Sequence, residues 1–314
     1  MEVSQLKGHP PDIRDLLART SRTFAIAIPL LPEPTQTEVC LAYLLFRVVD
    51  TLEDAATWTR AERTHALDRF AALLEDPLPG QLRGAAAAWI ERGVSGNPGY
   101  LDLIAALPEL FGEIGRLSAA SRAILFTHVR RTAAGMRGFI ERSDERGRLR
   151  LSTMDELRAY CYVVAGIVGE LLTELFLAGA PAVAAVKPVL VKHQAAFGEA
   201  LQLVNILKDQ RDDEADGRFY VPAGMRKDAM DLARDDLRRA ATYVQALRHA
   251  GAPGGFIAFT SFPAALAEAS LLQVERNGPG AKVSRAEVAE LLARAQAEAE
   301  AGHSPSAQSG KSLR

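Results

Sequence analysis

Apolar residues recur three and four positions apart along most of the chain, and stretches that alternate apolar and polar residues are rare. Because this spacing gathers apolar side chains on one face of a helix, it predicts α-helices and not strands. Segments rich in Gly and Pro separate the predicted helices, at 77–80, 93–99, 179–181, 217–224 and 251–255. The pattern therefore predicts an all-α fold.

The same pattern predicts a simple domain organisation. No strand followed by a glycine-rich turn and a helix is present in the sequence, and no segment of 20–50 residues repeats. Thr153 and Glu156 form a T-x-x-E capping box that marks one helix start. We expect one helical domain over residues 1–300 and a disordered polar tail over residues 301–314.

Composition narrows the class of protein. Apolar residues make up 48% and charged residues 24% of the 314 positions, which is typical of a globular protein with a large core. The formal net charge of -2 excludes a globally basic surface, so nucleic acid is not an expected partner. Cys40 and Cys161 each lie in an apolar helical pattern and form neither a disulfide framework nor a zinc motif.

The hydropathy pattern bears on localisation. The first residues have no apolar core typical of a signal peptide, and no run reaches about 18 uninterrupted apolar residues. We therefore expect a cytoplasmic protein, with at most peripheral contact on the inner face of the membrane.

A charged stripe interrupts the first strongly apolar helix. Tyr43, Arg47, Asp50 and Asp54 are spaced by four, three and four residues, which places them on one face of a helix. Apolar residues cover most of the remaining surface, so this helix belongs in a core. A charged stripe there must face a polar cavity or strong partners, because an unpaired buried charge is very costly.

A second segment repeats this arrangement. Gln202, Asn205, Asp209 and Asp213 share one face at the end of another apolar run. Two facing pairs of aspartates would be held together by divalent cations, and all-carboxylate ligation suits Mg²⁺ shared with substrate phosphates. A D-x-x-x-D pair is also common on solvated helices, so the pattern alone leaves a surface role open.

Five stretches together resemble the squalene/phytoene synthase family, and its squalene synthase branch most closely. They are SRTFAIAIPLLP (21–32), YLLFRVVDTLED (43–54), YCYVVAGIVGELLTELF (160–176), LQLVNILKDQRDDEADGRFYVP (201–222) and FTSFPAALAEASL (259–271). The second and fourth stretches resemble the two aspartate-rich motifs of the family. The resemblance implies an isoprenoid-synthase helical bundle with a central apolar cavity.

The resemblance also implies a reaction. Mg²⁺ assists the release of diphosphate from one farnesyl diphosphate, and a second farnesyl diphosphate attacks the allylic cation to form presqualene diphosphate. This intermediate is then rearranged and reduced by NADPH to squalene.

The resemblance assigns roles to individual residues. The metal ligands would be Asp50, Asp54, Asp209 and Asp213, supported by Glu53 and Asp212. The catalytic residues would be Tyr160, Tyr43, Arg47 and Phe259, with Tyr160 helping to remove the proton that closes the cyclopropane. The substrate would contact Ser21, Arg22, Phe24, Arg47, Val164, Gln202, Asn205 and Arg218.

Each role has a structural alternative. Arg47 could only neutralise Asp50, Ser21 could only cap a helix, and Tyr160 or Phe259 could only be core residues.

The sequence departs from the family at several positions. Lys208 replaces an arginine, so that bidentate contact with diphosphate is lost. Asp212 stands where a glutamate is usual. Lys282 and Arg285 lie in a segment that only partly resembles the nicotinamide-cofactor segment of squalene synthases, which makes NADPH a possible cofactor.

Alternative functions stay open. A family member could instead form presqualene diphosphate, hydroxysqualene, dehydrosqualene or phytoene. It could also be a non-catalytic assembly factor, although such a protein would be expected to lose metal ligands that are present here. A head-to-tail prenyltransferase or terpene cyclase would share the fold, but the segments 21–24 and 164–169 are less typical of those enzymes.

Overall fold

A computed structural model describes residues 12–144 and 147–301 of the chain. In chain order the elements are α1 (Ile13–Thr20), α2 (Phe24–Ala27), η1 (Ile28–Leu30), α3 (Thr35–Glu53), α4 (Arg60–Glu75), α5 (Pro79–Glu91), α6 (Pro98–Ala105), α7 (Leu107–Gly115), α8 (Ala119–Arg142), β1 (Leu149–Arg150), α9 (Met154–Cys161), η2 (Tyr162–Gly166), α10 (Ile167–Gly179), η3 (Pro181–Val186), α11 (Lys187–Ala215), β2 (Arg218–Phe219), α12 (Arg226–His249), α13 (Gly254–Asn277) and α14 (Arg285–Ala301). The predicted all-α fold is confirmed, since β1 and β2 are only two residues long.

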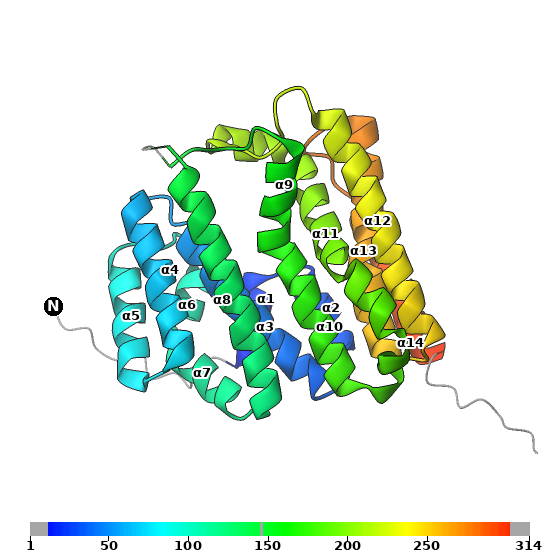
Figure 1. The fold of residues 1–314 in the computed structure, drawn as a ribbon, viewed down its shortest axis with the longest axis horizontal. Helices are drawn as coiled ribbons and strands as arrows, with labels where there is room; N and C mark the ends of the chain where they lie inside the picture. The colour runs from blue at the N-terminus through cyan, green and yellow to red at the C-terminus, as the bar shows by residue number, and fades with distance from the viewer. Residues whose placement is uncertain (1–11, 145–146, 302–314) are drawn as a thin grey trace, which may run out of the picture.

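The long helices form one bundle (Figure 1). α8, α10, α11 and α12 follow one another across the view, and each packs against the next. α3 packs against α8 and α10, α13 packs against α11 and α12, and α14 packs against α13. The predicted tail falls almost entirely on residues 302–314, which lie outside the described residues. The domain boundaries therefore stay a prediction.

α3 is the most enclosed of the long helices. Leu44, Leu45, Val48 and Val49 are completely buried, because α3 lies between other helices on several sides. Such enclosure leaves solvent-accessible space for charged side chains only near the end of the helix. The charged stripe that begins at Arg47 therefore lies where α3 emerges from the core.

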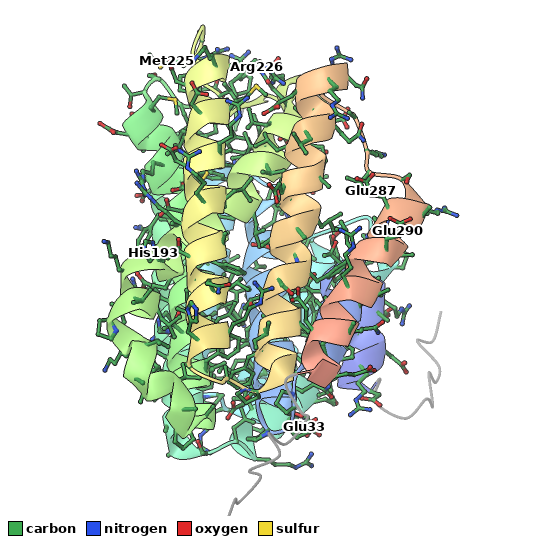
Figure 2. The ribbon with its side chains drawn as sticks, turned by 90° about the vertical axis from the view of Figure 1, so that its right-hand side faces the viewer. Glu33, His193, Met225, Arg226, Glu287 and Glu290 are labelled. Carbon is green, nitrogen blue, oxygen red and sulfur yellow. The ribbon has the colours of Figure 1, made fainter. Side chains whose placement is uncertain are left out.

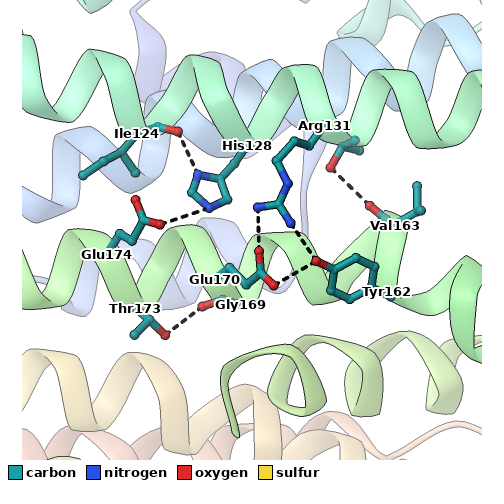
Figure 3. Close-up of polar contacts among 10 residues, drawn as sticks. Ile124, His128, Arg131, Tyr162, Val163, Gly169, Glu170, Thr173 and Glu174 are labelled. Atoms are coloured by element: carbon teal, nitrogen blue, oxygen red, sulfur yellow. Dashed lines mark hydrogen bonds and ion pairs between the residues drawn. The ribbon is translucent and has the colours of Figure 1, made fainter. Parts of the chain in front are cut away.

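Polar contacts hold α8 against the π turn η2 and against α10 (Figure 3). Arg131 of α8 donates to Glu170 and to the Tyr162 hydroxyl, each at 2.6 Å. The Tyr162 hydroxyl donates to Glu170 at 2.9 Å, and Thr132 donates to the Val163 carbonyl at 3.1 Å. These contacts fix the π turn beside the centre of the bundle.

Two helical segments, 154–179 and 254–277, are long and apolar enough to span a membrane. The expectation drawn from the sequence included no such segment, because it counted only uninterrupted apolar runs. About half of the most apolar window of each helix is buried inside the bundle, at 50% and 56%. A core helix of a soluble protein gives the same result, so these helices are weak evidence for a membrane span.

Small residues allow α11 to cross η2 and α10 at very short range. A Cβ atom at Gly198 would overlap the Ala165 carbonyl, and one at Gly169 would overlap the Gln194 carbonyl. The obstacles are backbone atoms, which cannot turn aside as a flexible side chain can. This crossing needs glycine at both positions.

We predict that Gly198→Ala lowers the free energy of unfolding by at least about 1–3 kcal/mol, because the added methyl group forces the two helices apart. Urea denaturation measures the change. Gly138→Ala in α8 is the matched control, because nothing lies within 4 Å of a Cβ at Gly138. Removing backbone freedom there should stabilise the protein by about 0.4–1 kcal/mol. Equal effects of the two substitutions would contradict the close crossing.

Candidate active site

A group of polar side chains surrounds Arg47 near the end of α3. Arg47 Nη2 donates to the Tyr43 hydroxyl at 2.9 Å, and Arg47 Nη1 lies 3.3 Å from Asp50 Oδ2. The guanidinium also lies 5.5 Å from the ring centroids of Tyr43 and Tyr100. Burial opposes the charge of Arg47, but Asp50 and Tyr43 outweigh it and raise the Arg47 pKa. Arg47 is therefore a fixed cation beside Asp50.

Tyr43 is itself held in place from both sides. Its hydroxyl donates to the Thr20 carbonyl at 2.9 Å, and its ring lies 5.4 Å from the ring of Phe24. The hydroxyl thus connects α1 to Arg47. This arrangement accounts for the spacing of Tyr43 and Arg47, which is one helical turn.

Arg218 links the ends of α3 and α11. It pairs with Leu149 in the short parallel ladder of β1 and β2. Its Nη1 lies 3.0 Å from Asp54 at the end of α3, and its Nε lies 3.6 Å from Asp213 of α11. Nη2 lies 3.1 Å from Asp216. The structure thus brings the two acidic segments together around one guanidinium.

Burial raises the pKa of three carboxyl groups in this region, those of Asp50, Glu53 and Asp213. Burial raises the pKa of Asp50 to about 6, and Asp54 adds to the effect. Burial also raises the pKa of Asp213 to about 6, against the opposing charge of Arg218. The pKa of Glu53 is raised as well, by burial and by Asp54. The cost of burying these carboxylates therefore exceeds the stabilisation that the neighbouring arginines provide.

The donor set suits Mg²⁺, although it is incomplete by itself. Within residues 12–144 and 147–301, no three His, Cys, Asp or Glu side chains lie close enough to hold a metal ion alone. Mg²⁺, however, commonly binds one or two carboxylates and completes its shell with water and phosphate oxygens. Facing carboxylates with raised pKa values would be stabilised by such a cation. The carboxylates of Asp50 and Asp213 are compatible with such a cation, whereas the assignment of Asp50, Asp54, Asp209 and Asp213 as its ligands stays a prediction.

The other predicted metal-binding residues have different surroundings. Asp209 is partly exposed and lies 3.3 Å from Lys208. Glu53 lines a separate cavity together with Arg218, whereas Asp212 is exposed to solvent. The supporting roles of Glu53 and Asp212 stay predictions.

An apolar cavity of about 210 Å³ adjoins Arg47 and Asp50. Its lining comes from α2, η1, α3, η2, α10, α11 and α13, and includes the predicted substrate residues Phe24, Val164, Gln202 and Asn205 together with Phe259. The predicted central apolar cavity is confirmed. Tyr43, Arg47 and Asp50 line the cavity as well, so the structure brings together eight predicted residues from all five of the stretches that carry the family resemblance.

Two further cavities lie at the acidic end of α3, and the smaller of them shares Arg47 and Asp50 with the apolar cavity. One, of about 160 Å³, is lined by Arg47, Asp50, Asp54 and Tyr100 among others. The other, of about 410 Å³, lies on the far side of Asp54 and includes Arg218 in its lining. Arg47 and Asp50 therefore border both an apolar and a polar space.

Tyr160 is not among the described residues that line the apolar cavity. Its ring stacks on Tyr220 at 4.6 Å, and its hydroxyl donates to the Tyr220 hydroxyl at 2.9 Å. Burial, with Tyr220 and Glu53 adding to it, raises the Tyr160 pKa well above its usual value. The phenol therefore keeps its proton at neutral pH, and its predicted part in proton removal is untested.

Ser21 and Arg22 lie in the turn between α1 and α2. The Ser21 hydroxyl accepts a hydrogen bond from the Phe24 backbone N–H at 3.0 Å, so it does act as a local cap. Arg22 is exposed. Neither residue is among those that line the apolar cavity in the described chain, and their contact with substrate stays a prediction.

Lys282 and Arg285, the predicted cofactor residues, are exposed at the junction of α13 and α14. The Gly280 backbone N–H of this junction donates to the Lys208 carbonyl at 2.7 Å. The junction is therefore fixed next to the acidic end of α11, close to Asp209.

Three residues of the site were missed by the sequence analysis. Tyr100 stacks on Arg47, Tyr220 holds Tyr160, and Arg63 lines the larger polar cavity. Tyr220 stands in the segment Gly217–Pro222 that was already noted, which was a usable signal. Tyr100 and Arg63 lie on α6 and α4, outside every motif, so only the folded structure could reveal them.

Comparison with protein families gives a match over most of the chain. The model of the family described as Squalene/phytoene synthase matches residues 17–227. Squalene synthase of Ganoderma lucidum is 27% identical over 230 residues, which cover 70% of this chain and 47% of that protein. Squalene synthase of Schizosaccharomyces pombe is 28% identical over 219 residues, which cover 68% and 45%. The chain spans about half the length of these relatives.

Solved structures share the fold. The structure of TcSQS with the ligand BPH1237 aligns with a TM-score of 0.71 and 23% identity, over 90% of this chain and 85% of that one. The squalene synthase HpnC from Alicyclobacillus acidocaldarius aligns with a TM-score of 0.53 and 21% identity, over 85% and 92%.

We predict that Arg218→Gln lowers the free energy of unfolding of the metal-free protein by about 1–3 kcal/mol, because the facing carboxylates lose the cation between them. Mg²⁺ should then raise the melting temperature of this variant more than that of the wild type. Arg238→Gln on α12 is the control, since Arg238 pairs with Asp235 at the surface. Identical unfolding midpoints for both variants would show that Arg218 does not bridge the helices.

We also predict that the protein binds Mg²⁺ more weakly at pH 5 than at pH 7. A carboxyl group with a pKa of about 6 is mostly ionised at pH 7 and mostly protonated at pH 5, and Mg²⁺ binds the ionised form. Each such group costs about tenfold in affinity between these pH values, so Asp50 and Asp213 together cost up to about 100-fold. Calorimetric titration measures the affinity. Asp50→Asn should remove about half of the dependence on a logarithmic scale, and pH-independent binding to the wild type would refute the prediction.

Proposed function

Because the chain belongs to the squalene/phytoene synthase family, we propose that it joins two farnesyl diphosphates head to head through presqualene diphosphate and forms squalene. One observation carries the proposal. The apolar cavity and the smaller polar cavity share Arg47 and Asp50 near the end of α3, and the larger polar cavity adjoins the smaller one at Asp54. A prenyl chain and a diphosphate need such a boundary between apolar and polar space.

Asp50, Asp54, Asp209 and Asp213 would hold Mg²⁺ at this boundary. Mg²⁺ there would neutralise the charge that develops on the departing diphosphate. The chain contributes further positive charge through Arg47 and Arg218. Both guanidiniums lie beside motif aspartates and carry their charge at neutral pH, so they would bind diphosphate oxygens by charge-assisted hydrogen bonds.

The apolar cavity would protect the allylic cation. Loss of diphosphate from the first substrate leaves a cation at C1, and the double bond of the second substrate attacks it. A cyclopropane forms as one proton is lost. Val164 and Phe259 belong to the wall that would exclude water from the cation. An aromatic face such as that of Phe259 also stabilises positive charge.

Tyr160 would serve proton removal only through its hydroxyl oxygen. That hydroxyl donates its own proton toward Tyr220, so the lone pairs of the Tyr160 oxygen remain to accept another. Tyr160 would accept a proton only as it passes its own to Tyr220, and Tyr220 in turn would pass a proton to the released diphosphate, the final base, in the larger polar cavity that Tyr220 borders.

Lys282 and Arg285 would bind the phosphate groups of NADPH, which would supply the hydride for the reduction to squalene. Their position next to the acidic end of α11 supports this assignment, because the Gly280 contact keeps the junction there. The same arrangement suits family members that stop at presqualene diphosphate or form hydroxysqualene, dehydrosqualene or phytoene. Product identity therefore separates the alternatives.

We predict that the protein with Mg²⁺, NADPH and farnesyl diphosphate releases squalene and diphosphate, identified by mass spectrometry. Omitting NADPH should leave diphosphate release but stop squalene formation. A C40 product formed from geranylgeranyl diphosphate without NADPH would contradict squalene synthesis and would identify the protein as a phytoene synthase.

Asp50→Asn should lower the rate of diphosphate release by at least about 100-fold, because one ligand of the shared cation is lost while the fold is retained. Asp76→Asn at the exposed end of α4 is the control and should keep the wild-type rate. Circular dichroism checks that both variants are folded. Turnover of Asp50→Asn at the wild-type rate would exclude the assigned role.

A further inference from the structure

The segment that joins α10 to α11 exposes apolar side chains to solvent. Val183 and Leu190 are completely buried and thereby fix the orientation of the segment. Val189 and Val191, on either side of Leu190, are 37% and 47% exposed. The remaining outward apolar residues of this surface are Pro181, Ala182, Ala184, Ala185 and Pro188. We call residues 181–192 the junction surface.

The junction surface is cationic as well as apolar. Acidic residues fill 39 of the 314 positions, so a stretch of 24 residues would hold about three, yet residues 175–198 contain none. Lys187 and Lys192 are exposed, and no carboxylate of the described residues forms an ion pair with either. The pKa of His193 is lowered by burial and by the neighbouring charges of Lys192 and Arg239. The positive field therefore extends along the start of α11.

The junction surface lies at the end of the bundle away from the carboxylates. Val189 and Asp213 are 24 residues apart on α11, which corresponds to about 36 Å. In Figure 2, Arg226 and Glu33 mark opposite ends of the bundle. Arg226 contacts Gln210 at the acidic end of α11, whereas Gly179, just before the junction surface, lies against Thr35 near Glu33.

We propose that residues 181–192 rest on the surface of an anionic lipid bilayer, with Val189 and Val191 inserted between head groups and Lys187 and Lys192 paired with lipid phosphates. Single exposed apolar residues are common on soluble proteins. Here, however, apolar residues, two unpaired lysines and the absence of acids coincide on one short segment. An anionic bilayer offers both negative charge for the lysines and an apolar interior for the valines. Water offers neither, and an acidic protein surface offers only the charge.

The purpose of such contact rests on the proposed function, because a hydrocarbon product cannot leave into water. Ile28 and Val39 line the apolar cavity on the side of the early residues of α3, which is the end that carries the junction surface. Contact at this end would place lipid near the apolar part of the cavity. The charged mouth at the other end would stay in water, where diphosphates are available.

Sedimentation with extruded vesicles tests the proposal. The wild-type protein should sediment with vesicles of phosphatidylglycerol and phosphatidylcholine in equal parts, and much less with phosphatidylcholine alone. Replacing Val189 and Val191 together by Asp, or Lys187 and Lys192 together by Gln, should weaken binding to the anionic vesicles at least about tenfold. Raising the salt concentration should weaken the binding of the wild type as well.

Leu78→Asp is the matched control, because Leu78 is 47% exposed at the start of α5, away from the junction surface. This variant should bind vesicles like the wild type, and circular dichroism checks that every variant is folded. Absence of wild-type binding to anionic vesicles, equal binding of all variants, or a stable dimer in lipid-free buffer that the Val189/Val191 variant dissociates would overturn the proposal. Vesicle binding does not require turnover, so failure of the prenyl-diphosphate assay and failure of lipid contact are separate results.

Discussion

The burial of carboxylates at the ends of α3 and α11 is the constraint on which the rest of this structure depends. Asp54 and Asp213 come from different helices, and the guanidinium of Arg218 lies between them. Arg218 can reach both because the pair of β1 and β2 holds its backbone beside Leu149. The pKa values of Asp50 and Asp213 are nevertheless raised, because the cost of burying each carboxylate exceeds the stabilisation from the neighbouring arginine. A further cation beside these carboxylates would therefore favour their ionised forms at this end of the bundle.

The same two helices separate charge from apolar surface. Most of α3 is completely buried, and its polar stripe appears only in its last turns. α11 begins at an exposed apolar and cationic segment and ends at the second acidic motif. A substrate with a charged head and a long apolar tail fits this polarity in only one direction. Under the proposed function, the head would lie with the carboxylates and the tail would extend along α3 into the apolar cavity.

The sequence predicts the helices and the acidic stripe, because both depend on the spacing of residues within one helix. The stripe of Tyr43, Arg47 and Asp50 has the contacts that its spacing predicts. The residues of other helices that contact this stripe could not be predicted from the sequence. Tyr100 lies on α6 and stacks on Arg47 only because α6 packs against α3, and no local pattern encodes that contact. Likewise, the sequence resemblance suggested that Tyr160 is close to substrate, whereas the structure adds Tyr220 as its hydrogen-bond partner.

The depth of the apolar cavity illustrates why product size is harder to infer than reaction type. Phe176 and Phe256 stack at 4.2 Å, and Phe259, which lines the cavity, meets Phe176 edge to face at 6.3 Å. This aromatic group comes from α10 and α13 and fills the space beyond the cavity wall. Its side chains belong to the densely packed core, so a change in any one of them would alter the available length while leaving the carboxylates unchanged. Under the proposed function, the acidic motifs would determine which bond breaks, whereas the packing of Phe176 against Phe256 and Phe259 would limit the length of chain that can be accommodated.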